Sequence, residues 1–173
     1  SKGKKPKAII AVHLYGMPAR MDEISALAEK YGIVLIEDAA EALGSSYKGK
    51  ACGSFGKFGI LSFNGNKIIT TSGGGALLSE DGEAIQKARF LSTQARDPAP
   101  HYQHSHIGYN YRLSNILAGI GRGQMEVLPA RVEKRRENHA FYAKSLGQIA
   151  GIKFLQEPEG HYSNRWLTCI LVE

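Results

Sequence analysis

Lys67 lies in a loop of small polar residues, a setting that suits an amine able to attack a carbonyl carbon. The loop joins two apolar runs, 58–63 and 76–78, and the small residues at 70–72 leave room for a ligand beside the amine. A nucleophilic lysine must lose its proton near neutral pH, and a partly desolvated pocket favours the uncharged amine. The alternative is an ordinary exposed lysine, which is the commonest state of a lone lysine in a loop.

Asp38 ends a second informative segment, because it follows the apolar run 33–36 and Glu37. A carboxylate at a strand end and a lysine in a later loop are the minimal groups of a pyridoxal phosphate (PLP) site. The lysine would form a Schiff base with the cofactor aldehyde. The carboxylate would keep the pyridine nitrogen protonated, so that the ring accepts electrons from the substrate carbon. Taken alone, Asp38 is also consistent with a helix N-cap or a turn.

A phosphate group would need hydroxyl or backbone N–H donors near a turn, and Ser62, shortly before Lys67, is a candidate. The glycines at 73–75 do not form a P-loop, because no Gly-Lys-Ser/Thr sequence follows them. They are better explained as residues that let the chain turn back into the sheet.

These groups need a scaffold, and the first third of the chain predicts one. Residues 7–13 form an apolar strand, residues 20–31 carry apolar side chains at helical spacing, and residues 33–37 form a second strand. This is a βαβ unit, so we expect parallel strands. Ligands of such sheets bind beyond the carboxyl ends of the strands, where His13 and Asp38 lie.

The remaining chain alternates short strands and helices. The expected elements are a hairpin at 47–50, strands at 58–63 and 74–79, a helix from Asp81 to about 93, a long loop at 94–106, a helix capped by Ser114, an interruption at Pro129, a charged helix at 130–146, and strands at 152–155 and 166–172. We expect two parts: residues 1–127 within one α/β domain, and residues 128–173 as a connecting helix and the beginning of a smaller domain.

The composition is that of an ordinary globular protein, with 43% hydrophobic and 22% charged residues. Part of the net charge of +6 comes from Lys2, Lys4, Lys5 and Lys7 and from residues 131–136, which we interpret as a solvated tail and a solvated helix face. An anion-attracting surface is the alternative. Nothing supports nucleic-acid binding.

The two cysteines, Cys52 and Cys169, are far apart and lack metal-ligand spacing, so we expect a reduced, cytoplasmic protein without a metal site. No apolar run reaches the roughly 18 to 20 residues that span a bilayer, and no signal peptide is visible. The first residues resemble a basic linker, and the last ones resemble a strand with nothing to follow. We therefore expect a piece of a longer protein.

Four segments together resemble one family. They are 12–16 (VHLYG), 37–44 (EDAAEALG), 62–67 (SFNGNK) and 108–114 (GYNYRLS), and their order and spacing also match. They are similar to the PLP-dependent sugar-nucleotide aminotransferases of the DegT type. The resemblance extends over nearly the whole chain. It implies the aspartate aminotransferase-like fold (fold-type I): a three-layer α/β domain with a mostly parallel sheet, only partly present here, then a long helix and the start of an α+β small domain.

The resemblance also implies roles for individual residues. Lys67 forms the Schiff base and moves the proton between substrate carbon and cofactor carbon. Asp38 pairs with the ring nitrogen, and Ser62 binds the phosphate. Glu41 lies near the ring hydroxyl, at a position where many relatives carry Gln or His.

Three further residues are implied to act outside this group. Asn110 reaches the phosphate of the neighbouring subunit's cofactor, which would make a homodimer with shared sites obligatory. Arg112 supports that segment or the substrate, and His13 approaches the sugar. A related branch of the family has histidine in place of the lysine and performs dehydration, and Lys67 argues against that branch.

The implied reaction moves an amino group, with glutamate as the donor, to a keto sugar attached to a nucleotide diphosphate, in bacterial glycan synthesis. The family's N-terminal third and most of its small domain are absent, so we expect residues 1–173 alone to be inactive. Two alternatives stay open. One is a catalytically inactive PLP-fold regulatory or structural protein. The other is a basic nucleotide- or RNA-binding α/β domain, whose binding would fall steeply with salt.

Overall fold

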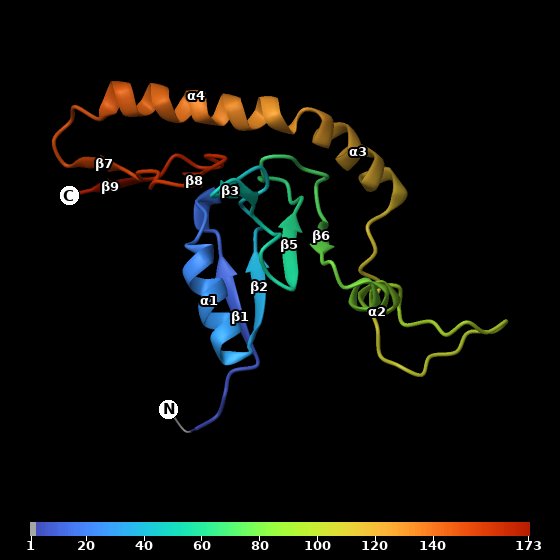
Figure 1. The fold of residues 1–173 in the computed structure, drawn as a ribbon. Coiled ribbons are helices and arrows are strands. Elements are labelled where there is room, and N and C mark those ends of the chain that lie inside the picture. Colours follow the sequence, from blue (N-terminus) through green and yellow to red (C-terminus); the bar gives the residue numbers. More distant parts are fainter. Residues whose placement is uncertain (1–2) are drawn as a thin grey trace.

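The computed structural model describes residues 3–173, so Lys2 of the basic N-terminal segment lies outside the described residues. Its centre is a four-stranded sheet in the order β1-β2-β5-β6 (Figure 1). The strands are β1 (Ala8–Val12), β2 (Val34–Asp38), β5 (Phe58–Ser62) and β6 (Gly75–Leu78). The first three are parallel, and β6 runs antiparallel at the edge. The expected α/β fold with a mostly parallel sheet is therefore confirmed.

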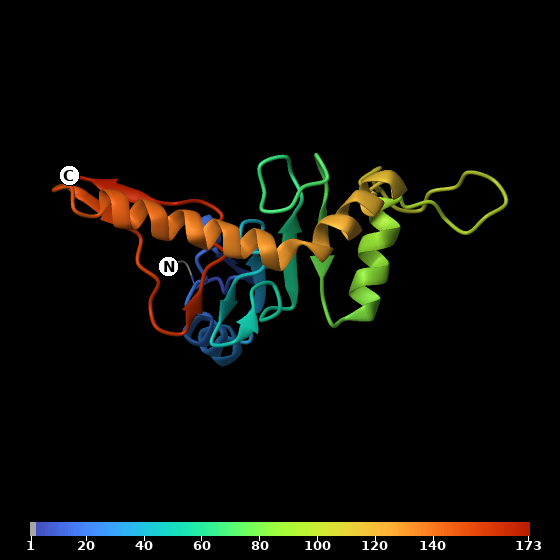
Figure 2. The ribbon, with the colours of Figure 1, turned by 90° about the horizontal axis from the view of Figure 1, so that it is seen from above.

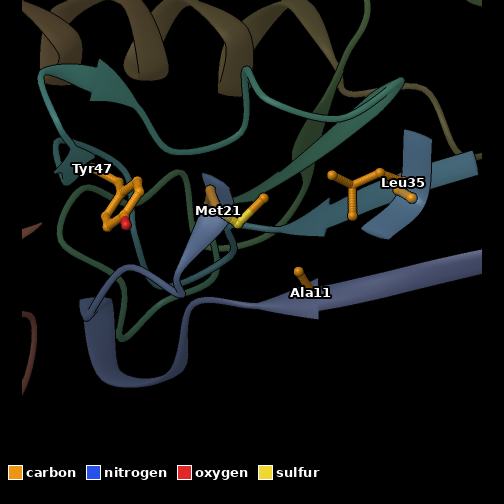
Figure 3. Packing of buried hydrophobic residues seen from close by; sticks show 5 residues of the cluster. Ala11, Met21, Leu35 and Tyr47 are labelled. Carbon is orange, nitrogen blue, oxygen red and sulfur yellow. The ribbon is translucent and has the colours of Figure 1, made fainter. Parts of the chain in front are cut away.

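Helix α1 (Met21–Tyr31) connects β1 to β2 and packs on the sheet, as a right-handed crossover requires. It ends at Gly32, whose left-handed conformation (φ 55°) lets its N–H bond the carbonyls of the last turn. A buried cluster joins helix and sheet through Ala11, Met21, Leu35 and Tyr47 (Figure 3). Tyr47 belongs to the short hairpin of β3 (Ser46–Tyr47) and β4 (Lys50–Ala51).

Two helix starts agree with the expected caps. The Asp81 side chain accepts a hydrogen bond from the Ala84 N–H at the start of α2 (Gly82–Ser92), and Ser114 accepts one from Leu117 at the start of α3 (Asn115–Glu126). Helix α4 (Leu128–Leu146) begins earlier than expected, because Pro129 occupies its first turn, where a missing N–H costs nothing.

Helices α3 and α4 run one after the other past the carboxyl edge of the parallel strands (Figures 1 and 2). The long irregular loop after α2 projects to one side of the molecule, away from that edge (Figure 2). Helix α4 therefore lies over the carboxyl ends of the parallel strands.

The C-terminal segment differs from the expectation. The predicted strand over 166–172 is only β9 (Ile170–Val172), which pairs with β7 (Ile152–Phe154). An unexpected strand, β8 (His161–Tyr162), pairs with β3 and extends the first hairpin. Residues 163–166 form no strand, because they make a buried turn against the sheet edge. Among residues 3–173, no helix has the length and apolarity needed to cross a membrane.

Candidate active site

Asp38 and Ser62 lie at the ends of neighbouring parallel strands. Asp38 is in register with Ile60, and β5 ends at Ser62, so both residues reach the same carboxyl edge. Asp38 Oδ1 accepts a hydrogen bond from the Ala40 N–H at 3.1 Å, which orients the half-buried carboxylate. Ser62 Oγ accepts one from the Asn64 N–H at 3.3 Å. Strand pairing thus explains why residues far apart in sequence share one edge.

The lysine loop, residues 64–73, leaves and re-enters the sheet at this edge. Its ends are closed by backbone hydrogen bonds from Phe63 N to Gly74 O (3.0 Å) and from Thr71 N to Phe63 O (2.9 Å). Buried Ile68 and Ile69 anchor its centre. The loop is therefore a fixed structure, and Lys67 extends from it with a side chain only 13% exposed.

The structure brings Glu41 next to Lys67, although the two are on different elements. Glu41 Oε1 lies 3.6 Å from Lys67 Nζ, and Oε2 accepts a hydrogen bond from the Tyr15 N–H at 2.6 Å. Tyr15 adopts positive φ (58°), an unusual conformation for a bulky residue. Three of the four segments that carry the family resemblance, 12–16, 37–44 and 62–67, thus meet at one place.

Trp166 is a site residue that the sequence analysis did not single out. Its ring centroid lies 4.4 Å from Lys67 Nζ, and the residue is 5% exposed. Its Nε1–H donates to the backbone carbonyl of Asn66 at 2.7 Å. One signal could have found it: Trp166 is the single tryptophan of the sequence.

Asn164 holds the C-terminal turn against the same edge. Its side-chain NH₂ donates to the carbonyls of Glu41 (2.8 Å) and Leu43 (2.9 Å), and its backbone N–H donates to Ser45 Oγ (2.9 Å). Its Oδ1 accepts from the Trp166 N–H at 2.8 Å. Asn164 is completely buried, so these bonds satisfy a side chain that would otherwise be costly to bury.

His13 does not face the open edge, and the expectation that it approaches the sugar finds no support in its position. The imidazole is completely buried; Nδ1 accepts from the Ala19 N–H (3.0 Å) and Nε2 contacts Glu37 Oε2 (3.0 Å). Because Nδ1 accepts, the ring hydrogen is on Nε2 and is donated to Glu37. His13 thus supports the structure beneath the site.

Glu37 is a second residue that the sequence analysis missed as a functional candidate. Its buried carboxylate also accepts backbone N–H bonds from Gly53 (2.8 Å), Phe55 (2.5 Å) and Gly56 (2.7 Å). Burial alone would raise the pKa of this carboxyl, but the bonds from His13 and the three amides outweigh it and lower the pKa below its ordinary value. Glu37 thus fixes the strand that carries Asp38.

Cys52 is buried near Glu37, and burial together with that negative charge raises the pKa of its thiol to about 12. The protonated thiol is a poor nucleophile. Lys67 is therefore the better candidate for covalent chemistry at this edge.

Asn110 and Arg112 lie elsewhere in the chain. Asn110 is exposed and forms an isolated bridge with Thr93, at the end of α2. Arg112 lines a hollow of about 410 Å³ between β6 and α2. Within one chain they do not join Lys67, so their expected action on a neighbouring subunit's site stays a prediction.

The residues at the carboxyl edge fit pyridoxal phosphate. Within residues 3–173, Lys67 Nζ makes no hydrogen bond, and Asp38 Oδ2 accepts none. A half-buried amine, a carboxylate with one unengaged oxygen and a nearby hydroxyl match the aldehyde, the ring nitrogen and the phosphate of this cofactor. A Cβ added at Gly65 or Gly73 would meet nothing within 4 Å, so the loop leaves open space beside the lysine.

The sequence of this chain is similar to those of known aminotransferases and sugar-nucleotide enzymes. EpsN of Bacillus subtilis, whose name provisionally describes a pyridoxal phosphate-dependent aminotransferase, is 61% identical over 171 residues, which are 99% of this chain and 44% of EpsN. A GDP-perosamine synthase of Escherichia coli O157:H7 is 38% identical over 96% of this chain and 45% of its own length. The chain thus spans less than half the length of the curated relatives it matches.

Solved structures show the same similarity. The aminotransferase TlmJ of Streptoalloteichus hindustanus superimposes with a TM-score of 0.91 at 30% identity, covering 99% of this chain and 48% of TlmJ. PseC of Helicobacter pylori, an aminotransferase involved in the biosynthesis of pseudoaminic acid, has a TM-score of 0.90 at 27% identity, covering 96% of this chain and 46% of PseC. A profile of the DegT/DnrJ/EryC1/StrS aminotransferase family matches residues 3–173, and the chain therefore belongs to this family of PLP-dependent enzymes.

Proposed function

We propose that the protein containing this chain transfers an amino group to a keto sugar attached to a nucleoside diphosphate, with glutamate as the donor. The observation that supports it most is the meeting of Lys67, Glu41 and Asp38 at one carboxyl edge. The names of several relatives point to the substrate class: GDP-perosamine synthases and transaminases of UDP-linked amino sugars.

Each residue has a proposed task. Bound pyridoxal phosphate supplies the electron-accepting ring on which an amino group is held. Lys67 Nζ takes the proton from the substrate carbon and returns it at the neighbouring position. Asp38 binds the cationic ring nitrogen, Glu41 lies beside the ring hydroxyl, and Ser62 donates its hydroxyl to the phosphate.

The elements that hold Lys67 and Asp38 in place support these tasks. Lys67 comes from a fixed loop, and Asp38 from a strand held by the buried Glu37. An amine that is held in the correct orientation beside the reacting carbon reacts faster than one that moves freely. A rigid loop therefore suits the task of Lys67. Helix α4 passes over the same edge (Figure 1).

The partner arrangement is also proposed. Asn110 and Arg112 are exposed and lie in the segment that follows α2, not in the lysine loop, which favours action on the site of a second copy in a homodimer. The two cysteines, Cys52 and Cys169, are free, which favours a reducing, cytoplasmic location. The break between α3 and α4 favours a domain boundary near residues 127 and 128.

The direct test is to trap the covalent link. The intact protein is loaded with pyridoxal phosphate, its visible absorbance is recorded, and the complex is reduced with borohydride, digested and mapped. We expect the modified peptide to contain Lys67. The matched control is Lys57, an exposed lysine at the opposite end of β5, which should stay unmodified.

Replacing Lys67 distinguishes an aminotransferase from a catalytically inactive regulatory or structural protein of the same fold. We expect Lys67→Ala to abolish amination of a UDP- or GDP-linked keto sugar while leaving the fold intact. A protein that keeps its cellular role after this change would be a regulatory or structural relative and not an aminotransferase.

A further inference from the structure

The Lys67 amine lies between an anion and an aromatic face. Nζ is 3.6 Å from Glu41 Oε1 and 4.4 Å from the centroid of the Trp166 ring. The side chains of Lys67 and Glu41 are only 13% and 22% exposed, so water screens these contacts weakly. The carboxylate attracts positive charge, and the indole face attracts a cation through its quadrupole.

The indole is held in place from two sides. Its Nε1–H bonds the backbone of Asn66, the neighbour of Lys67, at 2.7 Å, and its backbone N–H bonds Asn164 at 2.8 Å. Its ring packs in a buried cluster with Ile68 of the lysine loop and Val132 of α4. The Trp166 side chain therefore cannot turn away from the lysine without breaking contacts with two segments, the lysine loop and α4.

The backbone next to the indole is strained. Arg165 adopts a left-handed conformation (φ 50°) although it is large and buried. A long side chain in this region costs free energy and persists only where the surrounding structure requires it. Here the turn delivers Asn164 and Trp166 to the same edge, so the strain accompanies the placement of the indole.

We propose that Trp166 is a positioning residue that, with Glu41, forms a resting site for the protonated Lys67 amine whenever that amine is not bonded to the cofactor. This deepens the proposed function and depends on it for its catalytic meaning. During transamination the amine takes one proton from the substrate carbon and later releases one, so it is an ammonium for part of each cycle. The indole face stabilises this form by a cation–π interaction, which a neutral amine lacks.

The test measures the charge of Lys67 without cofactor. The intact apo-protein is labelled with acetic anhydride from pH 6 to 11, and the extent of labelling at Lys67 is quantified by peptide mass spectrometry in the wild type, Trp166→Phe and Trp166→Leu. The midpoint of the profile reports the stability of the ammonium. The plateau at high pH reports accessibility, so a merely uncovered lysine changes the plateau and not the midpoint.

We expect Trp166→Leu to lower the midpoint, so that labelling of Lys67 at a given pH below the plateau increases about three- to tenfold as the amine loses its cation–π partner. Trp166→Phe should fall between, because benzene is the weaker cation–π partner. Lys50, which lies 4.7 Å from the ring of Phe55 in an exposed position, is the internal reference and should not change. Equal midpoints in the three proteins would overturn the proposal.

Tryptophan fluorescence gives a second measurement, in which Trp166 itself is not substituted. The Lys67→Met variant should lose the part of the tryptophan emission that changes with pH over the labelling range, and the matched Lys50→Met variant should keep it. Emission that is the same in the Lys67→Met variant and the wild type would count against the contact. The two proposals can fail separately. If the Trp166 variants lower the midpoint but borohydride reduction leaves no cofactor on Lys67, the contact between Trp166 and Lys67 is supported and the proposed aminotransferase activity is not.

Discussion

At the scale of single residues, the most constrained group is the Glu37 carboxylate. It is completely buried, and four donors surround it: the His13 ring and three backbone amides of the turn before β5. Asp38, the residue proposed to bind the cofactor ring, follows it directly. A buried acid with all its partners satisfied therefore sets the position of Asp38, the half-buried acid proposed to bind the cofactor.

Glu37→Gln should destabilise the protein by about 3 kcal/mol, because the amide NH₂ would face backbone donors and the His13 bond would lose its charge. The measurement is urea unfolding at pH 7. Since the pKa of Glu37 is lowered in the folded state, its contribution is present above its ordinary pKa and is lost as the pH falls through the folded-state pKa. The gap between variant and wild type should accordingly shrink on acidification below about pH 4.5. A gap that stays constant down to pH 3 would contradict this account.

Gly16→Ala tests the close approach of two segments. Gly16 has φ +80°, and an added Cβ would lie 2.0 Å from Asn164 Oδ1 and 3.0 Å from the Glu41 carbonyl oxygen. We expect a loss of more than about 2 kcal/mol in unfolding free energy, together with a displaced Trp166 and altered emission.

The control for this change is Gly49→Ala, because Gly49 has the same φ of +80° and nothing within 4 Å of an added Cβ. It isolates the backbone strain, which costs about 1 to 2 kcal/mol. If both substitutions cost the same, the contact with Asn164 has no energetic weight.

At the scale of elements, the helices depend on caps that are readable from the sequence. Asp81 begins α2 and also lies 3.1 Å from the Lys57 amine across the strand end. The ion pair with Lys57 is at the surface, where ion pairs contribute little to stability. The cap should therefore account for most of the energetic effect of Asp81.

Asp81→Ala should lower the free energy of unfolding, because the Ala84 N–H loses its acceptor. Asp81→Asn keeps a good capping side chain and removes the charge, so it should cost less than half as much. Thermal unfolding and hydrogen exchange at the start of α2 measure both variants. Equal losses in the two would assign the effect to the ion pair with Lys57.

At the scale of the whole molecule, the proposed site is divided between two places in one chain. Lys67 lies at the carboxyl edge of the sheet, whereas Asn110 lies in the segment between α2 and α3, on the other side of β6 (Figure 1). A shared site in a homodimer would reunite them. This arrangement can be tested by mixing two inactive variants.

Lys67→Ala and Asn110→Ala proteins, each nearly inactive, should regain about a quarter of the wild-type activity when unfolded, mixed and refolded together. Half of the dimers would be mixed, and one of the two sites in each would contain both natural residues. Recovery is measured with a nucleotide-linked keto sugar. No recovery from a properly refolded mixture would place both residues in the same subunit's site or remove Asn110 from it.

Much of the fold could be predicted from the sequence, because it is encoded locally. Apolar periodicity predicted the βαβ unit, and Asp81 and Ser114 marked helix starts close to those observed. The candidates Asp38, Glu41, Ser62 and Lys67 came from the strand ends and from the family resemblance. The strand expected at 166–172 was wrong over residues 166–169, where the buried Trp166 packs against the lysine loop and makes no strand pairing.

The sequence by itself determined the order of the elements, the lone lysine in its loop and the acid at the strand end, since each depends on neighbours a few residues away. Only the tertiary structure decided that Glu41 and Trp166 enclose the Lys67 amine and that His13 is buried against Glu37. The Trp166 indole bonds a residue 100 positions away, at Asn66. Contacts of that range follow from how the C-terminal turn packs against the sheet edge, and no local pattern specifies them.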